Sequence, residues 1–305
     1  MKIGIVGAGN VGTAVGLLLK KKGNEIMGIC SRTRESALKA AYRLGCNVSD
    51  MLTLSQEAEV LFLTTKDSAI EEVCQEILLA GGFFPGQTVV HMSGSLTTEA
   101  LQPAHTRGCH LLSIHPLQSC ASVDLAVENI PGSIFSIEGD KQAYELGEQI
   151  VTELEGQFFY IDKETKPLYH AAACAASNYL VALLDLSRQL MLAAGMPHEL
   201  ATGAILPLVH GTLKNIVKLG TVDALTGPIA RGDLSTLEEH LAVMQENIPE
   251  LLQPYTSLGL YTAGLAEMKG TLSQREKQQF NRLFNSMIDI NDDDNNEEEK
   301  FQKLQ

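Results

Sequence analysis

The sequence predicts an α/β fold, in which a doubly wound, mostly parallel sheet is followed by an all-helical domain. Short apolar runs alternate with helical stretches as far as residue 162, and each run is typical of a strand buried on both faces. After residue 163 no further strand is indicated, and glycine and proline separate long helical stretches. We therefore expect a sheet domain at residues 1–162, a helical domain at residues 163–290 and an acidic, solvated tail at residues 291–305.

The composition bounds the class of protein. The chain has 305 residues and a net charge of −14. Its 45% hydrophobic and 20% charged residues are globular values, and the acidic excess argues against nucleic-acid binding. The six cysteines form no C-x-x-C pair and none has a histidine at metal-ligand spacing, so we expect reduced thiols and no metal. The first strand leaves no room for a signal peptide, and the apolar stretch Ala171–Leu184 is too short and too polar to span a bilayer. We expect a soluble, cytoplasmic protein that does not bind membranes.

The first stretch, Lys2–Gly12, is a buried strand followed by glycines at G-x-G-x-x-G spacing and then by a helix. Glycine permits a tight turn, a close approach of the backbone to a pyrophosphate and close packing of the helix on the strand. The diphosphate would lie over the free N–H groups at the start of the helix. The sequence therefore predicts a dinucleotide site, the alternative being a structural glycine turn. The candidate cofactor residues in this stretch are Gly7, Gly9, Asn10, Val11 and Gly12.

The end of the second predicted strand, Glu25–Cys30, favours NADP over NAD. An NAD site usually has an acidic residue here for the ribose hydroxyls, but the chain continues Ser31-Arg32-Thr33-Arg34. A guanidinium group matches a pair of phosphate oxygens, so we expect Ser31 and Arg32 to bind the 2′-phosphate. Alternatively, Thr33 caps the next helix, Arg34–Leu44, and the arginines are solvated.

The third predicted strand, Val60–Thr64, precedes a helix at Ser68–Leu79 for which Asp67 is the expected cap. Thr64 and Thr65 lie where open sheets bind ligands. They either contact the ribose or diphosphate of the cofactor or only cap the turn, and the sequence leaves both alternatives open.

The later strands end in polar residues suited to proton transfer. Gln87–Met92 is followed by Ser93-Gly94-Ser95, and Leu111–His115 is followed by Pro116. Because the carboxyl ends of parallel strands share one edge of the sheet, Ser93 and His115 are expected near the nicotinamide. We interpret His115 as a proton donor or acceptor; alternatively it bonds the backbone of its own turn. The remaining elements of this half are a helix at Thr97–Thr106, a strand at Ser133–Ile137, a helix at Lys141–Leu154 and a strand at Phe158–Ile161.

The helical half begins with one predicted helix, Tyr169–Ala194. Its polar residues His170, Cys174 and Asn178 follow Lys166 at four-residue spacing, so His170 and Asn178 share a face. They either contact substrate and transfer a proton or form a network between helices. Further helices are expected at His198–Leu219, Leu234–Glu246, Pro249–Met268 and Ser273–Met287.

The loop Leu225–Asp233 interrupts these helices. Its Arg231 lies beside two glycines and could bind a substrate carboxylate through two N–H groups of its guanidinium; alternatively it pairs with Asp233.

Together these motifs resemble a Rossmann-like family of NADP oxidoreductases whose C-terminal helical domain has no assigned function. The resemblance covers roughly residues 2–285. It is carried by Gly-Ala-Gly-Asn-Val-Gly, Ser-Arg-Thr, Met-Ser-Gly-Ser-Leu, His-Pro-Leu-Gln, Leu-Tyr-His-Ala-Ala-Ala, Ala-Ser-Asn-Tyr-Leu and Leu-Thr-Gly-Pro-Ile-Ala-Arg-Gly-Asp. The wider relatives are pyrroline-5-carboxylate reductases, ketopantoate reductases, β-hydroxyacid dehydrogenases and prephenate dehydrogenases.

The wider relatives imply roles for several residues. Prephenate dehydrogenases have a similar loop whose histidine accepts a proton with a serine in support, which implies these roles for His115 and Ser93. In β-hydroxyacid dehydrogenases a lysine precedes an asparagine by four residues. Asn178 matches this asparagine, but Cys174 stands in place of the lysine, so that mechanism does not transfer intact. Similarity to pyrroline-5-carboxylate reductases implies a homodimer through the C-terminal helices and a carboxylate contact at Arg231.

The sequence thus predicts an NADP-dependent oxidoreductase that transfers hydride between NADP(H) and a small carboxylate-bearing hydroxy, keto or imino compound. His115 and His170 are the proton-transfer candidates, and Asn178 and Arg231 orient the substrate. The rival hypothesis is an NADP-binding sensor or scaffold without turnover, because a nucleotide fold does not establish chemistry. A deazaflavin paired with NADP is a third possibility that other relatives suggest.

Overall fold

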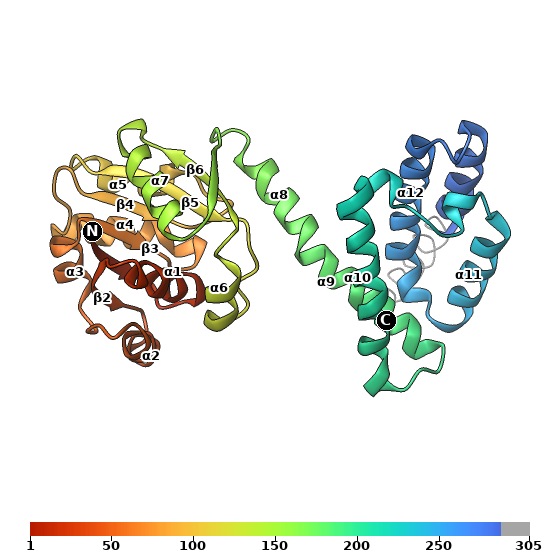
Figure 1. Ribbon diagram of the computed structural model, residues 1–305, viewed down its shortest axis with the longest axis horizontal. Coiled ribbons are helices and arrows are strands. Elements are labelled where there is room, and N and C mark those ends of the chain that lie inside the picture. Colours follow the sequence, from red (N-terminus) through yellow and green to blue (C-terminus); the bar gives the residue numbers. More distant parts are fainter. Residues whose placement is uncertain (288–305) are drawn as a thin grey trace, which may run out of the picture. The chain divides into compact units, whose positions relative to one another are not determined.

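The computed structural model describes residues 1–287 and confirms the predicted fold class (Figure 1). A seven-stranded sheet with helices on both faces is followed by helices only. The predicted tail at residues 291–305 lies outside the described residues. The chain divides into two compact units, the first comprising Met1–Tyr179 and the second starting at Leu180.

The sheet of the first unit has the strand order β2-β1-β3-β4-β5-β6-β7. Neighbouring strands are parallel except β5 and β6, which are antiparallel. The strand order reverses between β1 and β3: β2 is added on one side of β1, and β3 and the later strands are added on the other. Open sheets bind ligands at such a point. The strands are β1 Lys2–Val6, β2 Glu25–Cys30, β3 Val60–Leu63, β4 Thr88–His91, β5 His110–Pro116, β6 Ile134–Gly139 and β7 Gln157–Tyr160.

Two apolar cores lie on the two faces of the sheet. One core is covered by α1 Asn10–Lys21, α2 Arg34–Leu44, α6 Val123–Asn129 and α7 Tyr144–Glu153, the last preceded by the 3-10 turn Lys141–Ala143. The other is covered by α3 Met51–Glu57, α4 Asp67–Ala80, the 3-10 turn η1 Thr98–Leu101 and α5 Gln102–His105. Helices α3 and α6 were not predicted, since seven residues are too few to establish a helical period.

On the second face, the apolar core gives way to buried polar residues toward the carboxyl ends of β4 and β5. His91 pairs with Ser113, and Ser113 pairs with Glu138, so three polar side chains form a row across three strands. His115 and Ser136 form the next pair along β5 and β6. Alternate residues of a strand share a face, so these five side chains lie on one side of the sheet. We call His91, Ser113 and Glu138 the buried polar row.

The helix that follows the sheet differs from the prediction. Two helices, α8 Lys166–Ala176 and α9 Asn178–Ala193, replace the single predicted helix, with a break at Ser177. The first unit also extends beyond the predicted boundary at residue 163, to Tyr179. The physical reason is that α8 packs on the sheet, where Lys166 is fully buried and Tyr169 bonds His115.

The second unit consists of the predicted helices, packed around its own apolar core, which includes Leu241 and Phe284. Gly220 is non-helical inside α10, with φ 81°, close to the predicted helix end. The elements are α9, α10 His198–Asp223, η3 Ile229–Arg231, α11 Leu234–Asn247, η4 Pro249–Leu251, α12 Leu252–Lys269 and a helix over residues 274–287.

Helix α10 is unusually apolar and uncovered. Among the described residues it is the one helix that is long and apolar enough to cross a membrane, judged by length and composition alone. Its most apolar 18-residue stretch has a mean hydropathy of 1.2, and only 11% of that stretch is buried. A single such helix is weak evidence for a membrane span, and α10 is a different segment from the apolar stretch Ala171–Leu184. Its own unit leaves a series of apolar side chains uncovered, namely Leu200, Leu206, Leu208, Leu213, Val217 and Leu219.

The turn from β1 into α1 packs tightly against the end of β3. Gly7 has φ 118°, and a Cβ there would lie 2.6 Å from the Thr65 nitrogen. A Cβ on Gly12 would lie 2.7 Å from the Gly7 carbonyl oxygen and would overlap the Thr64 hydroxyl. Only glycine therefore lets the start of α1 lie against β1 and β3.

We expect Gly12→Ala to destabilise the first unit by about 1–3 kcal/mol, because the added methyl group overpacks the turn. Gly147→Ala in α7 is the matched control. Its Cβ meets Leu112 at an ordinary 3.4 Å, so the gain in helix propensity should leave stability unchanged or higher by up to about 1 kcal/mol. Urea unfolding followed by circular dichroism measures both variants. Equal stability of the two variants would contradict this account of the turn.

Candidate functional site

A groove of about 1000 Å³ runs along the carboxyl ends of β1, β2 and β3 and reaches the end of β4. It lies at the point where the strand order reverses, which is the expected ligand site of such a sheet. Its lining includes the predicted residues Gly7, Gly9, Asn10, Val11, Ser31, Arg32, Thr64, Thr65 and Ser93, whereas Gly12 lies beneath it in the packing of α1.

Gly9 differs from its two neighbouring glycines. Among residues 1–287, a Cβ at Gly9 would meet nothing closer than the Thr64 carbonyl oxygen at 3.9 Å, so none of their atoms requires glycine there. The open space borders the N-terminus of α1, whose cap position has no side-chain hydrogen bond. The first N–H groups of the helix and its positive dipole end are thus available to an anion.

The polar side chains around this turn are partly occupied. Asn10 donates from Nδ2 to the carbonyl oxygens of Cys120 and Ala121, at 2.9 and 3.0 Å, so its side chain holds the loop after β5. The Thr64 hydroxyl donates to the Gly7 carbonyl oxygen at 2.8 Å and closes the turn. The Asn10 side-chain nitrogen is therefore engaged by this loop, while the residue itself still lines the groove.

The loop after β2 has the chemistry that the sequence indicated. Ser31 is half-buried, Arg32 is exposed, and neither side chain makes a hydrogen bond within residues 1–287. Thr33 caps α2 by accepting from the Ser36 nitrogen at 3.4 Å, as the structural alternative expected. Arg34 is exposed at the first position of α2. A cation and a hydroxyl therefore remain available at the end of the groove.

Two histidines from distant parts of the sequence meet beside the loop after β4. The His115 and His170 ring centroids are 6.2 Å apart, edge to face. A Cβ on Gly94 would lie 2.7 Å from both His115 Nε2 and His170 Nδ1, so both nitrogens converge on the space that this glycine leaves. His115 Nδ1 bonds the Tyr169 hydroxyl at 2.8 Å. Within the described residues, the buried His170 Nδ1 has no hydrogen-bond partner.

Ser93 connects the groove to these histidines. Its hydroxyl donates to Asp67 Oδ2 at 2.6 Å, and the Ser95 hydroxyl donates to the same oxygen at 2.9 Å. The prediction that Asp67 caps α4 was wrong, because Lys66 holds the cap position. The Asp67 carboxylate instead fixes the loop that carries Gly94.

Burial keeps two histidines neutral. It lowers the pKa of His115 to about 4, with further repulsion from Lys166 and His170. It lowers the pKa of His91 to about 3. His91 has both ring nitrogens bonded, with Nε2 to the Thr97 carbonyl at 3.1 Å and Nδ1 to the Ser93 nitrogen at 3.2 Å. His91 is therefore structural, whereas His115 keeps Nε2 toward Gly94.

A buried cation near this site was not predicted from the sequence. Lys166 is fully buried, donates to the Ser113 hydroxyl and lies 3.6 Å from Glu138 Oε2. Burial lowers its pKa to about 8. The signal for it was its four-residue spacing from His170, which the sequence analysis noted without assigning Lys166 a role.

Two predicted residues do not join this cluster. Asn178 begins α9 beyond the break at Ser177, so it leaves the face predicted to be shared with His170, and it is exposed. Arg231 is exposed and belongs to the second unit. Asp233 accepts from the Thr236 nitrogen at 3.2 Å as the cap of α11, rather than pairing with Arg231.

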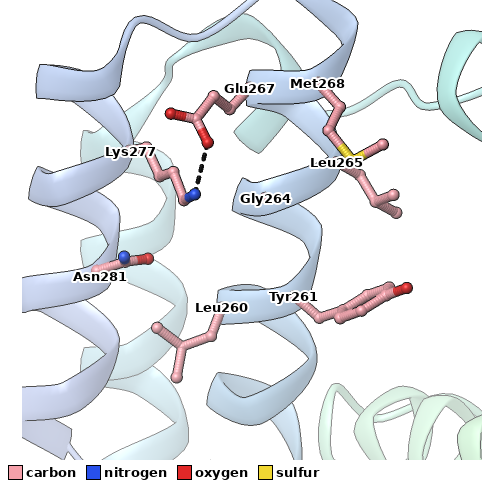
Figure 2. A pocket seen from close by; sticks show the side chains of 8 residues that line it. All are labelled: Leu260, Tyr261, Gly264, Leu265, Glu267, Met268, Lys277 and Asn281. Carbon is pink, nitrogen blue, oxygen red and sulfur yellow. Dashed lines mark hydrogen bonds and ion pairs between the residues drawn. The ribbon is translucent and has the colours of Figure 1, made fainter.

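A smaller hollow of about 370 Å³ lies in the second unit, between α12 and the helix over residues 274–287 (Figure 2). Lys277 Nζ and Glu267 Oε2 face each other across it at 2.5 Å. Its other lining residues are mostly apolar: Leu260, Tyr261, Gly264, Leu265, Met268 and Asn281. The groove and the histidine pair of the first unit are therefore the stronger candidates for chemistry. Within residues 1–287 no group of three His, Cys, Asp or Glu side chains could hold a metal ion.

Several solved structures have the same fold as this chain. The structure of "putative NADP oxidoreductase BF3122" from Bacteroides fragilis is 24% identical, with a TM-score of 0.72 over 87% of this chain and 98% of that one. Protein TM1727 from Thermotoga maritima is 28% identical, with a TM-score of 0.68 over 88% and 99%. Plasmodium falciparum pyrroline carboxylate reductase with NADP bound is 12% identical, with a TM-score of 0.57 over 92% and 98%. The sequence matches no curated protein.

Two family models match the chain. Residues 1–116 match the Rossmann-like domain, and residues 133–262 match the domain of unknown function DUF2520. The second match begins at β6, so it includes the last two strands of the sheet as well as helices of both units. The resemblance inferred from the sequence motifs is confirmed: a match to the Rossmann-like domain is followed by a match to DUF2520.

Proposed function

We propose that the protein is an NADP-dependent oxidoreductase that acts on a small carboxylate-bearing hydroxy, keto or imino compound. The observation that carries the proposal is the continuity of the site in the first unit. One groove begins at Arg32, passes the open space at Gly9 and ends at Ser93, where the loop of Gly94 meets two imidazoles.

The residues of the groove fit NADP. The space beside Gly9 and the free N–H groups of α1 suit the diphosphate, while Ser31 and Arg32 suit the 2′-phosphate. The structural relative from Plasmodium falciparum holds NADP on the same fold. When bound, NADP(H) supplies or accepts a hydride at its nicotinamide ring.

The imidazoles suit the accompanying proton transfer. His115 is neutral at physiological pH because its pKa is about 4, so Nε2 can accept a proton from a substrate hydroxyl or amine and return it in the reverse direction. The hydrogen bond to Tyr169 holds the ring in one orientation. His170 Nδ1 offers a second polar contact on the same side of Gly94. Asn178 and Arg231 remain proposed substrate contacts, Arg231 for the carboxylate.

The proposal extends to a cytoplasmic homodimer in which α10 packs against a second copy. Its uncovered leucines and valine form the kind of apolar surface that subunit interfaces cover. Helix α10 contains Lys214 and Lys218 and has a kink at Gly220. Charged side chains and non-helical backbone are costly inside a bilayer, so these features fit a protein interface better than a membrane span.

Arg32→Ala should weaken NADPH binding on the order of 10- to 100-fold, since a charge-assisted hydrogen bond to phosphate is lost, and leave NADH binding unchanged. Arg34→Ala, which removes the neighbouring exposed guanidinium group, is the matched control. Isothermal titration of each variant with both cofactors measures the effect. An equal loss for NADPH and NADH would rule out Arg32 as the 2′-phosphate contact.

Replacing His115 and His170 together by Gln should lower the turnover on the order of 10²- to 10⁴-fold and preserve NADPH binding. NADPH oxidation against a panel of keto acids and cyclic imino acids measures it, with exposed His105→Gln as the control. When the substrate is oxidised by NADP⁺, His115 accepts a proton, so the rate of this reaction should fall only as the pH drops toward 4, where His115 becomes protonated. Undiminished turnover in the double variant contradicts the assignment. NADPH binding without turnover on any acceptor would favour the sensor hypothesis.

The assembly is tested by light scattering. The native protein should have the mass of two chains, and Val217→Lys on α10 should yield monomers, because a buried charge disfavours an apolar interface. Lys218→Met leaves that surface apolar and should remain dimeric. A monomeric native protein contradicts the proposed dimer.

A further inference from the structure

Lys166 occupies an unfavourable position for a lysine. It is fully buried, and as the first residue of α8 it adds a positive charge to the positive end of the helix dipole. A buried ion pair seldom stabilises a fold more than apolar side chains of similar size do. Stability alone therefore gives no reason for a lysine at this position.

The contacts of Lys166 all lead to the buried polar row. Its ammonium group donates to the Ser113 hydroxyl on β5 and lies 3.6 Å from Glu138 Oε2 on β6. Glu138 in turn accepts from the Thr98 nitrogen at 2.9 Å and from the Thr98 hydroxyl at 2.7 Å. One cation thus joins α8, two strands of the sheet and η1, the 3-10 turn that follows the Gly94 loop.

The same helix carries two residues of the candidate site. Tyr169 and His170 follow Lys166 by three and four residues, and side chains at these spacings share one face of a helix. Fixing Lys166 against Ser113 sets the rotation of α8. At this rotation the Tyr169 hydroxyl reaches His115 Nδ1 and His170 Nδ1 reaches the space at Gly94.

We propose that Lys166 is a positioning residue of the oxidoreductase site, whose buried ammonium group ties α8 to Ser113 and Glu138 and thereby holds His115 and His170 in their working arrangement. The inference rests on the proposed function for the meaning of the site, but its geometry does not depend on turnover.

The charges around His115 give this residue a measurable signature. Lys166 and His170 face it from α8 and lower its pKa, after the larger effect of burial. Asp67 faces it from α4 and acts in the opposite direction, while His91 lies on the neighbouring strand β4. Removing the Lys166 charge should therefore raise the pKa of His115, whereas an arginine should preserve it.

The test is an NMR titration of histidine-labelled protein without cofactor or substrate. In Lys166→Met the titration midpoint of His115 should rise by about one pH unit. Lys166→Arg should stay near the native midpoint. Lys163→Met is the matched control, because it removes an exposed lysine just before α8 that pairs with Glu99 at the surface. If Lys166→Met does not fold, the double variant Lys166→Met with Glu138→Gln removes both charges together and takes its place.

A second readout separates positioning from cofactor binding. Lys166→Met should lower kcat for NADPH oxidation on the order of 100-fold, because the imidazoles lose their alignment, and leave the Kd for NADPH unchanged. An unchanged His115 midpoint in the folded variant overturns the role of Lys166, whatever the turnover. If the native protein binds no NADPH, the proposed function fails, and the titration still decides the role of Lys166.

Discussion

The structure depends on the close packing of the turn between β1 and α1 against the end of β3. Gly7 and Gly12 leave no room for side chains because Thr64 fills the space beside them, and the Thr64 hydroxyl bonds the Gly7 carbonyl. This contact brings the N-terminus of α1 to the point where the strand order reverses. Gly9 has no such neighbour, so the same turn that is closed on its inner side is open toward the groove.

The second constraint is the change from apolar to polar residues along one face of the sheet. The N-terminal parts of β4 and β5 contribute to an apolar core, whereas their carboxyl ends carry His91, Ser113 and His115. Buried polar groups need partners, and α8 supplies them through Lys166 and Tyr169. The requirement for satisfied hydrogen bonds thus explains why the first helix after the sheet belongs to the first unit, and why its histidine meets His115.

Local patterns in the sequence were sufficient for most of the fold. The apolar runs and caps predicted β2 and α2 with their observed ends, because each of these elements has its own periodicity and boundary residues. Position at strand ends was also enough to propose Ser93 and His115 for one site. The break at Ser177 was not readable, because an alanine-rich stretch has helix propensity on both sides of it. The role of Lys166 was missed, because its four-residue spacing from His170 does not show that its partners come from the antiparallel pair β5 and β6, which is a long-range contact.

A crystal structure of the protein with NADP⁺ would test the proposed cofactor site directly. We expect the diphosphate over Gly9 and the N-terminus of α1, the 2′-phosphate at Ser31 and Arg32, and nicotinamide C4 on the side of Gly94 where the His115 and His170 nitrogens converge. A complex in which the nicotinamide lies away from both imidazoles would contradict the account, and so would a groove that does not take up NADP⁺ at saturating concentration.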